Sequence, residues 1–170
     1  MKAAPARFVR YSRRAAVAAL ILAGASDAPA VGEAVPALKA AEIEANLVGK
    51  TFRATTRRVP VGDPDNPTGM VTRSDGAYAD IDIFVRPDHS IIFRCTMHRR
   101  DGTSAACSGG GYARDVGVWS IEGDQFCYQF TTSRAGRKQC NAVLRDGAGL
   151  RFRLTSGPPS SIDGERLVSK

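Results

Sequence analysis

Four cysteines are the residues of this chain whose type and spacing point most directly to chemistry. They are Cys95, Cys107, Cys127 and Cys140. An even number of cysteines, with no Cys-x-x-Cys pair and no cluster of histidines, is typical of disulfides rather than of a metal site. We therefore expect structural disulfides, no metal ion and no other cofactor.

The predicted turns indicate which cysteines pair. An Asp-Gly hairpin signal lies midway between Cys95 and Cys107, and Cys127 and Cys140 lie symmetrically about the polar stretch at Ser133. Folding each hairpin brings its two sulfurs face to face, in the short approach of a non-hydrogen-bonded pair. Cys95–Cys107 and Cys127–Cys140 are the predicted bonds, and each is worth roughly 3 kcal/mol through loop closure.

Hydrolysis would need a serine, histidine and carboxylate together, or two carboxylates facing one substrate. His98 with Asp101 could orient Ser104, but no Gly-x-Ser-x-Gly turn surrounds any serine. Asp80 and Asp82 fall on one strand face about 7 Å apart, which suits paired acids, although alternating acids on a surface strand are more often only solvated. We expect a protein that is not an enzyme.

Three residues are candidates for ligand binding. Trp119, the single tryptophan, could stack on a ligand at a barrel mouth or anchor the core, and the size of its side chain favours the core. The glycine run 109–111 suggests either a β-bulge or a flexible loop at the mouth. Gly110 and Tyr112, both in or beside that run, are the other two candidates.

The first 30 residues have the three parts of a secretory signal peptide. Five basic residues precede an apolar run over residues 15–25, and two small-residue cleavage sites follow at 23–25 and 28–30. Eleven apolar residues rise roughly 16 Å as a helix, which is too short for a permanent membrane span. The adjacent Arg13 and Arg14 leave a twin-arginine signal open. We expect a periplasmic or secreted protein whose residues 31–170 form a single domain.

Export would change the charge of the working protein. The whole chain has 24 basic and 17 acidic residues, and loss of residues 1–30 leaves 19 and 16, a formal charge of +3. This is an ordinary margin for solubility and not the concentrated basic stripe that nucleic acid requires. The expected partner is an unknown small molecule or an envelope protein.

One helix and about eight strands are expected. Ala and Glu dominate residues 36–47, with Pro36 at the first helical position and Gly49 just past the end. Period-two patterns or turn signals predict strands at 51–59, 77–85, 91–97, 116–121, 126–131, 139–144, 150–154 and 166–168. Residues 60–76 are expected to form an irregular loop. An antiparallel meander of this length can hide its edges by closing into a small barrel, of the lipocalin or avidin type, and a two-sheet sandwich is the alternative.

The sequence GVWSIEGDQFC at residues 117–127, followed by Cys140 and Gly147, resembles a group of small exported proteobacterial proteins. That group is classed as a domain of unknown function. The resemblance spans roughly residues 43–154 and includes the Leu47-x-Gly49-x-Thr51 entry. It implies a periplasmic barrel-like domain and no particular activity.

A weaker similarity links the chain to periplasmic lysozyme inhibitors. Their Ser-Gly-x-x-Tyr motif, Trp strand and Gly-Asp turn are echoed at residues 108–112, Trp119 and 123–124, but the basic residue after the Trp is missing. The expected function is a non-catalytic binding or envelope-associated module. An inhibitor of an envelope hydrolase such as lysozyme is the alternative.

Overall fold

The period-two segments of the sequence form strands in the computed structural model, which describes residues 35–60, 70–107 and 113–170. The predicted signal peptide, Gly110 and Tyr112 lie outside the described residues. In chain order the described elements are α1 (Ala40–Leu47), β1 (Thr51–Thr56), β2 (Arg58–Pro60), β3 (Met70–Thr72), β4 (Tyr78–Val85), β5 (Ser90–His98), β6 (Ser104–Ala106), β7 (Arg114–Glu122), β8 (Gln125–Phe130), a short 3-10 turn (Ser133–Gly136), β9 (Gln139–Asp146), β10 (Gly149–Ser156) and β11 (Arg166–Ser169).

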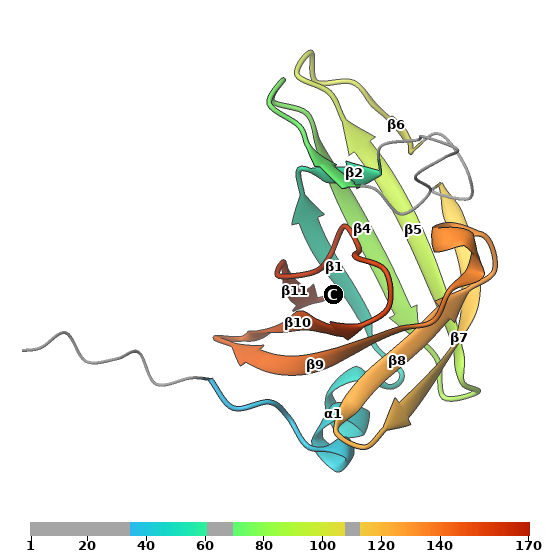
Figure 1. Cartoon of the computed structure of the whole chain (residues 1–170). Coiled ribbons are helices and arrows are strands. Elements are labelled where there is room, and N and C mark those ends of the chain that lie inside the picture. Colours follow the sequence, from blue (N-terminus) through green and yellow to red (C-terminus); the bar gives the residue numbers. More distant parts are fainter. Residues whose placement is uncertain (1–34, 61–69, 108–112) are drawn as a thin grey trace, which may run out of the picture. The chain divides into compact units, whose positions relative to one another are not determined.

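Eight antiparallel strands close into a barrel (Figure 1). Their order is β4-β1-β11-β10-β9-β8-β7-β5, and β5 pairs back with β4 over their whole length. Strand β6 is an extra strand paired with β5, while β2 and β3 form a separate two-stranded ribbon. The predicted barrel is therefore confirmed. The sandwich alternative is wrong, because the ring of hydrogen-bonded strands has no gap at which two sheets could separate.

Alternation along each strand fills the interior of the barrel. On β4, the side chains of Ala79, Ile81, Ile83 and Val85 are at most 2% exposed, and they face the core. Phe126 on β8 and Phe152 on β10 pack against each other with ring centroids 5.7 Å apart. The outward positions between these residues carry mostly polar side chains, as expected for a half-buried strand.

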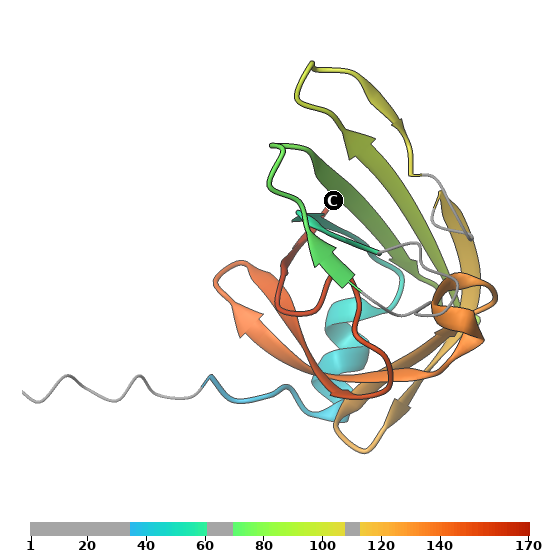
Figure 2. The same ribbon diagram turned by 45° about the horizontal axis from the view of Figure 1, so that its top comes forward.

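Helix α1 covers one end of the barrel, and Figure 2 shows it at the far end of the strands. Ile43 and Leu47 are fully buried there. The prediction that the helix begins at Pro36 is wrong. The residues just after Pro36 pair with β9 instead, and the Leu38 N–H donates to the Val143 carbonyl at 2.8 Å. The first turn is capped by two carboxylates: Glu42 accepts from the Lys39 N–H, and the distant Asp124 accepts from the Ala40 N–H, each at 3.0 Å.

The other end of the barrel carries the loops that build the site. Because neighbouring strands are antiparallel, the turn between β8 and β9 and the loop between β10 and β11 lie together at the end opposite α1. Strand β3 also lies in the segment that was predicted to be irregular. The predicted strand 51–59 is divided at Arg57, where Thr56 Oγ1 accepts from the Arg58 N–H at 2.9 Å.

Both predicted disulfides are present. Cys127 and Cys140 face each other across β8 and β9 with a Cα–Cα distance of 4.0 Å, as expected for a non-hydrogen-bonded pair. Cys95 and Cys107 differ from the prediction: their Cα atoms are 5.4 Å apart, and the Cys107 N–H donates to the Cys95 carbonyl at 3.2 Å. That pair is hydrogen-bonded. Two disulfides indicate an oxidising compartment outside the cytoplasm.

No helix in the described part of the chain is long and apolar enough to cross a membrane.

Candidate functional site

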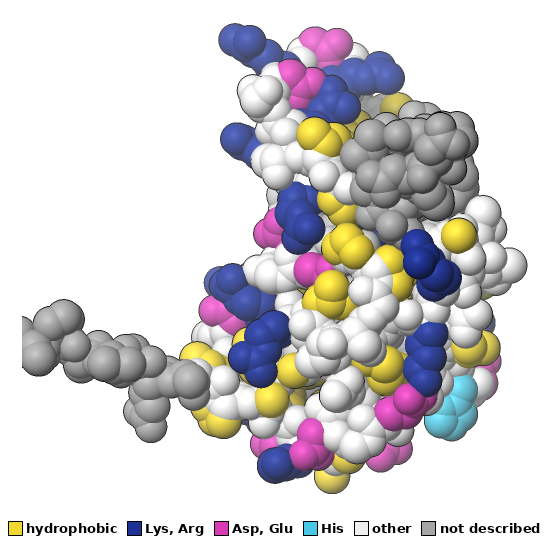
Figure 3. Space-filling model, in the orientation of Figure 1, with side chains coloured by type: hydrophobic (Ala, Val, Ile, Leu, Met, Phe, Trp, Pro, Cys, Tyr) yellow, Lys and Arg dark blue, Asp and Glu magenta, His cyan; other side chains and the backbone are white. Residues whose placement is uncertain are grey.

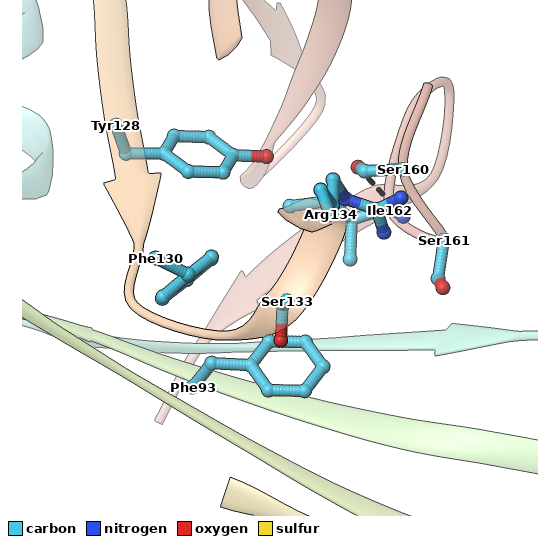
Figure 4. A pocket seen from close by; sticks show the side chains of 8 residues that line it. All are labelled: Phe93, Tyr128, Phe130, Ser133, Arg134, Ser160, Ser161 and Ile162. Atoms are coloured by element: carbon cyan, nitrogen blue, oxygen red, sulfur yellow. Dashed lines mark hydrogen bonds between the residues drawn. The ribbon is translucent and has the colours of Figure 1, made fainter. Parts of the chain in front are cut away.

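A narrow cavity opens at the barrel end opposite α1 (Figure 4). It encloses about 300 Å³ of atom-free space, part of it open to solvent, and a water-sized sphere has little room to move inside. Eight residues line it: Phe93, Tyr128, Phe130, Ser133, Arg134, Ser160, Ser161 and Ile162. Phe93 and Phe130 form an apolar wall from β5 and β8, and Ile162 adds to it from one loop. Tyr128, Arg134 and the three serines supply the polar atoms.

Asp115 on β7 fixes the turn that forms one wall of the cavity. Its Oδ2 accepts from the Thr132 N–H at 3.0 Å and from the Ser133 N–H at 2.6 Å, while its Oδ1 accepts from the Val116 N–H at 2.8 Å. Asp115 is only 5% exposed. A buried carboxylate on the barrel wall thus determines where the chain turns after β8.

The same turn sends Arg134 inward. Arg134 and Ala135 have φ of 60° and 54°, in the left-handed region where a side chain costs of order 1 kcal/mol. The Arg134 side chain is 7% exposed, and its Nη1 donates to the Pro159 carbonyl and to Met70 Sδ at 3.8 Å. A charged guanidinium therefore lies within the barrel mouth, held by a backbone that an arginine rarely adopts.

The loop between β10 and β11 forms the opposite wall. Asp163 organises it, because its carboxylate accepts from the Ser160 N–H, from Ser160 Oγ at 2.9 Å and from Gln139 Nε2 at 2.8 Å. Gly157, with φ of 91°, lets this loop cross over β9, since a Cβ there would stand 2.3 Å from the Lys138 carbonyl. The Ser160 and Ile162 side chains then reach the cavity from this side (Figure 4).

Several polar atoms in and below the cavity are buried without a hydrogen-bond partner. They are Tyr128 Oη, Ser133 Oγ, Gln139 Oε1 and Asn141 Nδ2. Burial raises the pKa of the Tyr128 hydroxyl to about 12, so it stays protonated and able to donate. Tyr128 and Ser133 line the cavity, whereas Gln139 and Asn141 do not, so two hydroxyls at the cavity are available to an additional partner, either a water or a ligand.

The chain matches no protein-family model, no curated protein and no solved structure. The site is consequently assigned from its own geometry.

Of the three sequence-predicted binding residues, Trp119 is the one that the structure describes, and it does not line this cavity. Trp119 lies in the core with 6% of its surface exposed, and its indole N–H donates to the Arg86 carbonyl at 2.8 Å, near the end that α1 covers. Gly110 and Tyr112 fall outside the described residues, so their role stays a prediction. The favoured interpretation of Trp119 as a core anchor agrees with its burial.

The predicted serine–histidine pair is present, but with a different carboxylate. His98 Nδ1 lies 2.9 Å from Ser104 Oγ, and His98 Nε2 lies 3.2 Å from Asp80 Oδ2. Asp101 was the wrong partner: it accepts from the N–H and hydroxyl of Thr103 and only closes the hairpin. The sequence could not show this, because Asp80 is brought beside His98 by the pairing of β4 with β5.

The hydrogen-bonded side chains of Ser104, His98 and Asp80 lie on the outer surface of the barrel, away from the cavity. Asp80 also accepts from Thr55 Oγ1 at 2.7 Å, and Tyr78 stacks on the His98 ring with centroids 4.7 Å apart. The contacts therefore link β1, β4, β5 and β6 side by side. Their plainest role is to hold these strands together.

Asp82, the second acid of the predicted pair, forms ion pairs with Arg53 and Lys170. Arg53 contacts it with two nitrogens, at 2.8 Å and 2.9 Å, and Lys170 Nζ is 2.7 Å away. The Arg53 hydrogen bond, aided by Lys170, holds the pKa of the Asp82 carboxyl below its usual range. A carboxylate stabilised in this way is a poor proton donor.

One group in the described part of the chain could place three ligand atoms within 4.8 Å, namely Glu122, Cys127 and Cys140. Both sulfurs are already joined in a disulfide, so they cannot serve as thiolate ligands.

The charged surface is mixed on the face drawn in Figure 3. Lys and Arg side chains are spread around exposed hydrophobic ones, with Asp and Glu between them. This face of the molecule therefore carries both signs of charge and, among the described residues, no patch of a single sign.

The residues that form the cavity were missed by the sequence analysis. Ser133 and Arg134 were included only as part of a hairpin turn, and Tyr128 only as part of a strand. The signal that existed was weak: Tyr128, Gln139 and Asn141 are polar residues at inward positions of β8 and β9, which becomes visible only once the register is known.

Proposed function

We propose that this protein is an exported, non-catalytic β-barrel that binds a small molecule at the open end of the barrel. The observation that carries the proposal is the pair of orphaned hydroxyls, Tyr128 Oη and Ser133 Oγ, beside the buried Arg134. Leaving a buried polar group without a partner costs about 1–3 kcal/mol. A bound ligand would supply the missing partners.

The architecture suits this role. Helix α1 and its buried Ile43 and Leu47 cover one end, so the loops at the other end are the natural entrance. Barrels of eight strands have interiors just wide enough to hold side chains or one small ligand. Apolar walls with a few convergent polar groups are also the usual composition of a small-molecule site.

The proposed compartment is the periplasm or the medium. Two disulfides and a signal-like N-terminus support export, and the short resemblance to small exported proteobacterial proteins agrees with it. Fractionation of cells that express the tagged chain tests this part. Recovery of the protein in the cytoplasm with free thiols would contradict it.

A fragment screen by amide NMR tests the binding role. Small polar and apolar fragments are added to the protein with both disulfides formed, and the shifted amides are mapped. We expect the hits to gather on Phe93, Tyr128, Phe130 and the loops around Arg134 and Ser160. Hits confined to the outer face, or no hits at all, would contradict the proposal.

The absence of catalysis is also part of the proposal. A broad hydrolase substrate screen, run on the native chain and on His98→Ala and Asp80→Asn, tests it directly. We expect no turnover from any of the three proteins. Turnover in the native chain that both substitutions abolish would replace the binding proposal with an enzyme built on Ser104, His98 and Asp80.

The hydrolase-inhibitor alternative depends on residues 108–112, which lie outside the described residues. Mixing the protein with lysozyme at micromolar concentration and measuring cell-wall lysis tests it. Full lysozyme activity in the mixture ends that alternative and leaves the small-molecule proposal in place.

A further inference from the structure

We propose that the outer wall formed by β5 and β7 binds the surface of a membrane that contains anionic lipid. The site consists of Arg94 on β5 and of Arg114, Val116 and Val118 on β7, and we call these four residues the arginine–valine face. All four side chains are exposed. The face lies on the outside of the barrel and is independent of the cavity at the barrel end.

Two like charges stand directly opposite each other on this wall. Arg94 and Arg114 are register partners. The neighbouring Cys95 N–H donates to the Ala113 carbonyl at 3.1 Å, so Arg94 and Arg114 form a non-hydrogen-bonded pair, the kind whose side chains approach most closely. Like charges directly opposite destabilise a sheet, and among the described residues neither arginine side chain has a hydrogen bond or an ion pair. An anion from outside the chain would relieve this repulsion.

A second arginine pair in the same barrel shows the contrast. Arg151 on β10 and Arg166 on β11 are also register partners. There the chain supplies its own anion, because Asp146 Oδ2 lies 2.6 Å from Arg151 Nη2. The pair of Arg94 and Arg114 has no such carboxylate within the part of the chain that the structure describes.

The two carboxylates that border the arginine–valine face already have donors. Asp82 lies opposite Arg94 on β4, but Arg53 contacts its two oxygens at 2.8 Å and 2.9 Å. Asp88, in the turn between β4 and β5, accepts from the Ser90 N–H at 2.9 Å and from the Ser90 hydroxyl at 2.6 Å. The arginine pair therefore remains available to an external anion.

Apolar side chains continue the face along β7. Val116 and Val118 are 47% and 61% exposed, and Val118 is the most exposed large hydrophobic residue in the described part of the chain. Ile92 on β5 lies opposite Val116, and Phe84 on β4 lies opposite Ile92. The Arg86 guanidinium stands over the Phe84 ring at 5.4 Å from its centroid. Cations and an apolar strip thus share one exposed wall.

Charge and shape together favour a bilayer as the partner. A second copy that met this wall through the same residues would bring two arginine pairs onto one interface. An anionic membrane instead offers phosphate groups to the arginines, which bind them bidentately, and an apolar layer to the valines. Because a bilayer deforms, it also fits the convex outer wall of a closed barrel.

Sedimentation with vesicles tests the proposal on the disulfide-bonded protein. One set of vesicles contains phosphatidylcholine alone, and the other contains three parts phosphatidylcholine to one part phosphatidylglycerol. We expect the protein to bind the second set at least about tenfold more tightly, and to be released by high salt. Equal binding to both sets, or binding to neither, would overturn the proposal.

A charge-matched pair of variants locates the site. Arg94→Gln combined with Arg114→Gln should weaken vesicle binding at least about tenfold, since each arginine near an anionic surface contributes about fivefold. Arg151→Gln combined with Arg153→Gln removes the same charge from β10, which lies four strands from β5 in either direction round the ring, and should weaken binding about twofold or less. Equal weakening in the two variants would overturn the assignment to this face.

Urea unfolding separates a binding role of the arginine pair from a structural one. Replacing Arg94 and Arg114 removes a repulsion, so the unfolding midpoint of that variant should equal or exceed that of the native chain. A lower midpoint together with weaker vesicle binding would show that the arginines stabilise the fold, and would overturn their proposed role.

The valines distinguish a membrane from an acidic protein. Val118→Ser should weaken vesicle binding about threefold, because the side chain would enter the apolar layer, whereas Val168→Ser, at a residue 48% exposed on β11, should leave it unchanged. Soluble polyglutamate serves as the acidic comparison. If it binds as tightly as the anionic vesicles and Val118→Ser affects neither, the partner is an acidic protein and the membrane proposal fails.

Discussion

Asp115 on β7 holds the backbone of Ser133 in place through a hydrogen bond of 2.6 Å from the Ser133 N–H to Asp115 Oδ2. The two residues are 18 positions apart in sequence, and this contact connects the barrel wall to the turn that carries Arg134. The orientation of the one arginine in the cavity lining therefore depends on a carboxylate that does not itself line the cavity.

Removing this carboxylate should destabilise the protein strongly. Asp115→Ala leaves three backbone N–H groups without their acceptor, so we expect a loss of about 3 kcal/mol in the free energy of unfolding. Urea unfolding measures this as a lower midpoint with an unchanged slope. Asp146→Ala, which removes only an exposed ion pair with Arg151, is the control and should cost about 0.5 kcal/mol or less. Equal losses in the two variants would contradict the role of Asp115.

The raised pKa of the Tyr128 hydroxyl predicts that the folded protein loses stability in alkali. Burial raises the pKa of its hydroxyl from 10.0 to about 12, so above pH 10 the unfolded chain releases a proton that the folded chain retains. The stability contributed by this group is complete below pH 10 and falls as the pH rises towards 12, by roughly 3 kcal/mol at the upper end. Unfolding by urea at several pH values measures the decline.

Tyr128→Phe provides the control for this pH dependence. The variant removes a buried hydroxyl that has no partner, so at neutral pH it should be as stable as the native chain or slightly more stable. Between pH 10 and 12 it should lack the additional decline. An identical alkaline loss in both proteins would show that another group is responsible.

A side chain at Gly117 should clash with the neighbouring strand, where β7 pairs with β8 and Gly117 lies opposite Phe130. A Cβ at this position would stand 2.2 Å from the Gln129 carbonyl and 2.8 Å from Phe130 Cα, both of them backbone atoms. Gly117→Ala should therefore cost about 3 kcal/mol or more, because the two strands must separate. Gly164→Ala meets no atom within 4 Å and has only its φ of 80° against it, so it should cost about 1 kcal/mol. Similar midpoints for the two variants in urea would contradict the close approach.

Removing one disulfide or the other should reduce hydrogen-exchange protection in different strands. By loop length each is worth roughly 3 kcal/mol. However, Cys95–Cys107 joins the barrel to β6, whereas Cys127–Cys140 joins two strands of the closed ring. Replacing Cys95 and Cys107 by alanine should therefore remove hydrogen-exchange protection mainly in β6, and replacing the other pair should lower protection in β8 and β9. Loss of protection throughout the barrel in the first variant would contradict this division.

Most of the fold could be predicted from the sequence because the relevant signals are local. Alternation at residues 77–85 and turn residues at 123–124 and 146–147 define strands and their partners without any knowledge of distant segments. The helix start could not be found in this way. Besides the local cap by Glu42, it is fixed by Asp124, a residue of the β7–β8 turn that approaches Ala40 only in the folded barrel.

The site could not be predicted, since its parts lie far apart in sequence and each has an ordinary local explanation. Arg134 stands in a hairpin turn, where an arginine is usually exposed, and only the left-handed backbone turns it inward. Similarly, Asp80 could be paired with His98 only after the register of β4 and β5 was known. Polar residues at inward positions are thus the feature to examine first once a register is available.

A crystal structure of the protein with a brominated fragment that binds in the NMR screen tests the central claim most directly, because the bromine can be located by anomalous scattering. The account predicts the bromine in the cavity lined by Phe93, Tyr128 and Phe130, with a polar atom of the fragment within hydrogen-bond distance of Tyr128 Oη or Ser133 Oγ. Water alone in the cavity at saturating ligand, or bromine bound only on the outer face of the barrel, would contradict it.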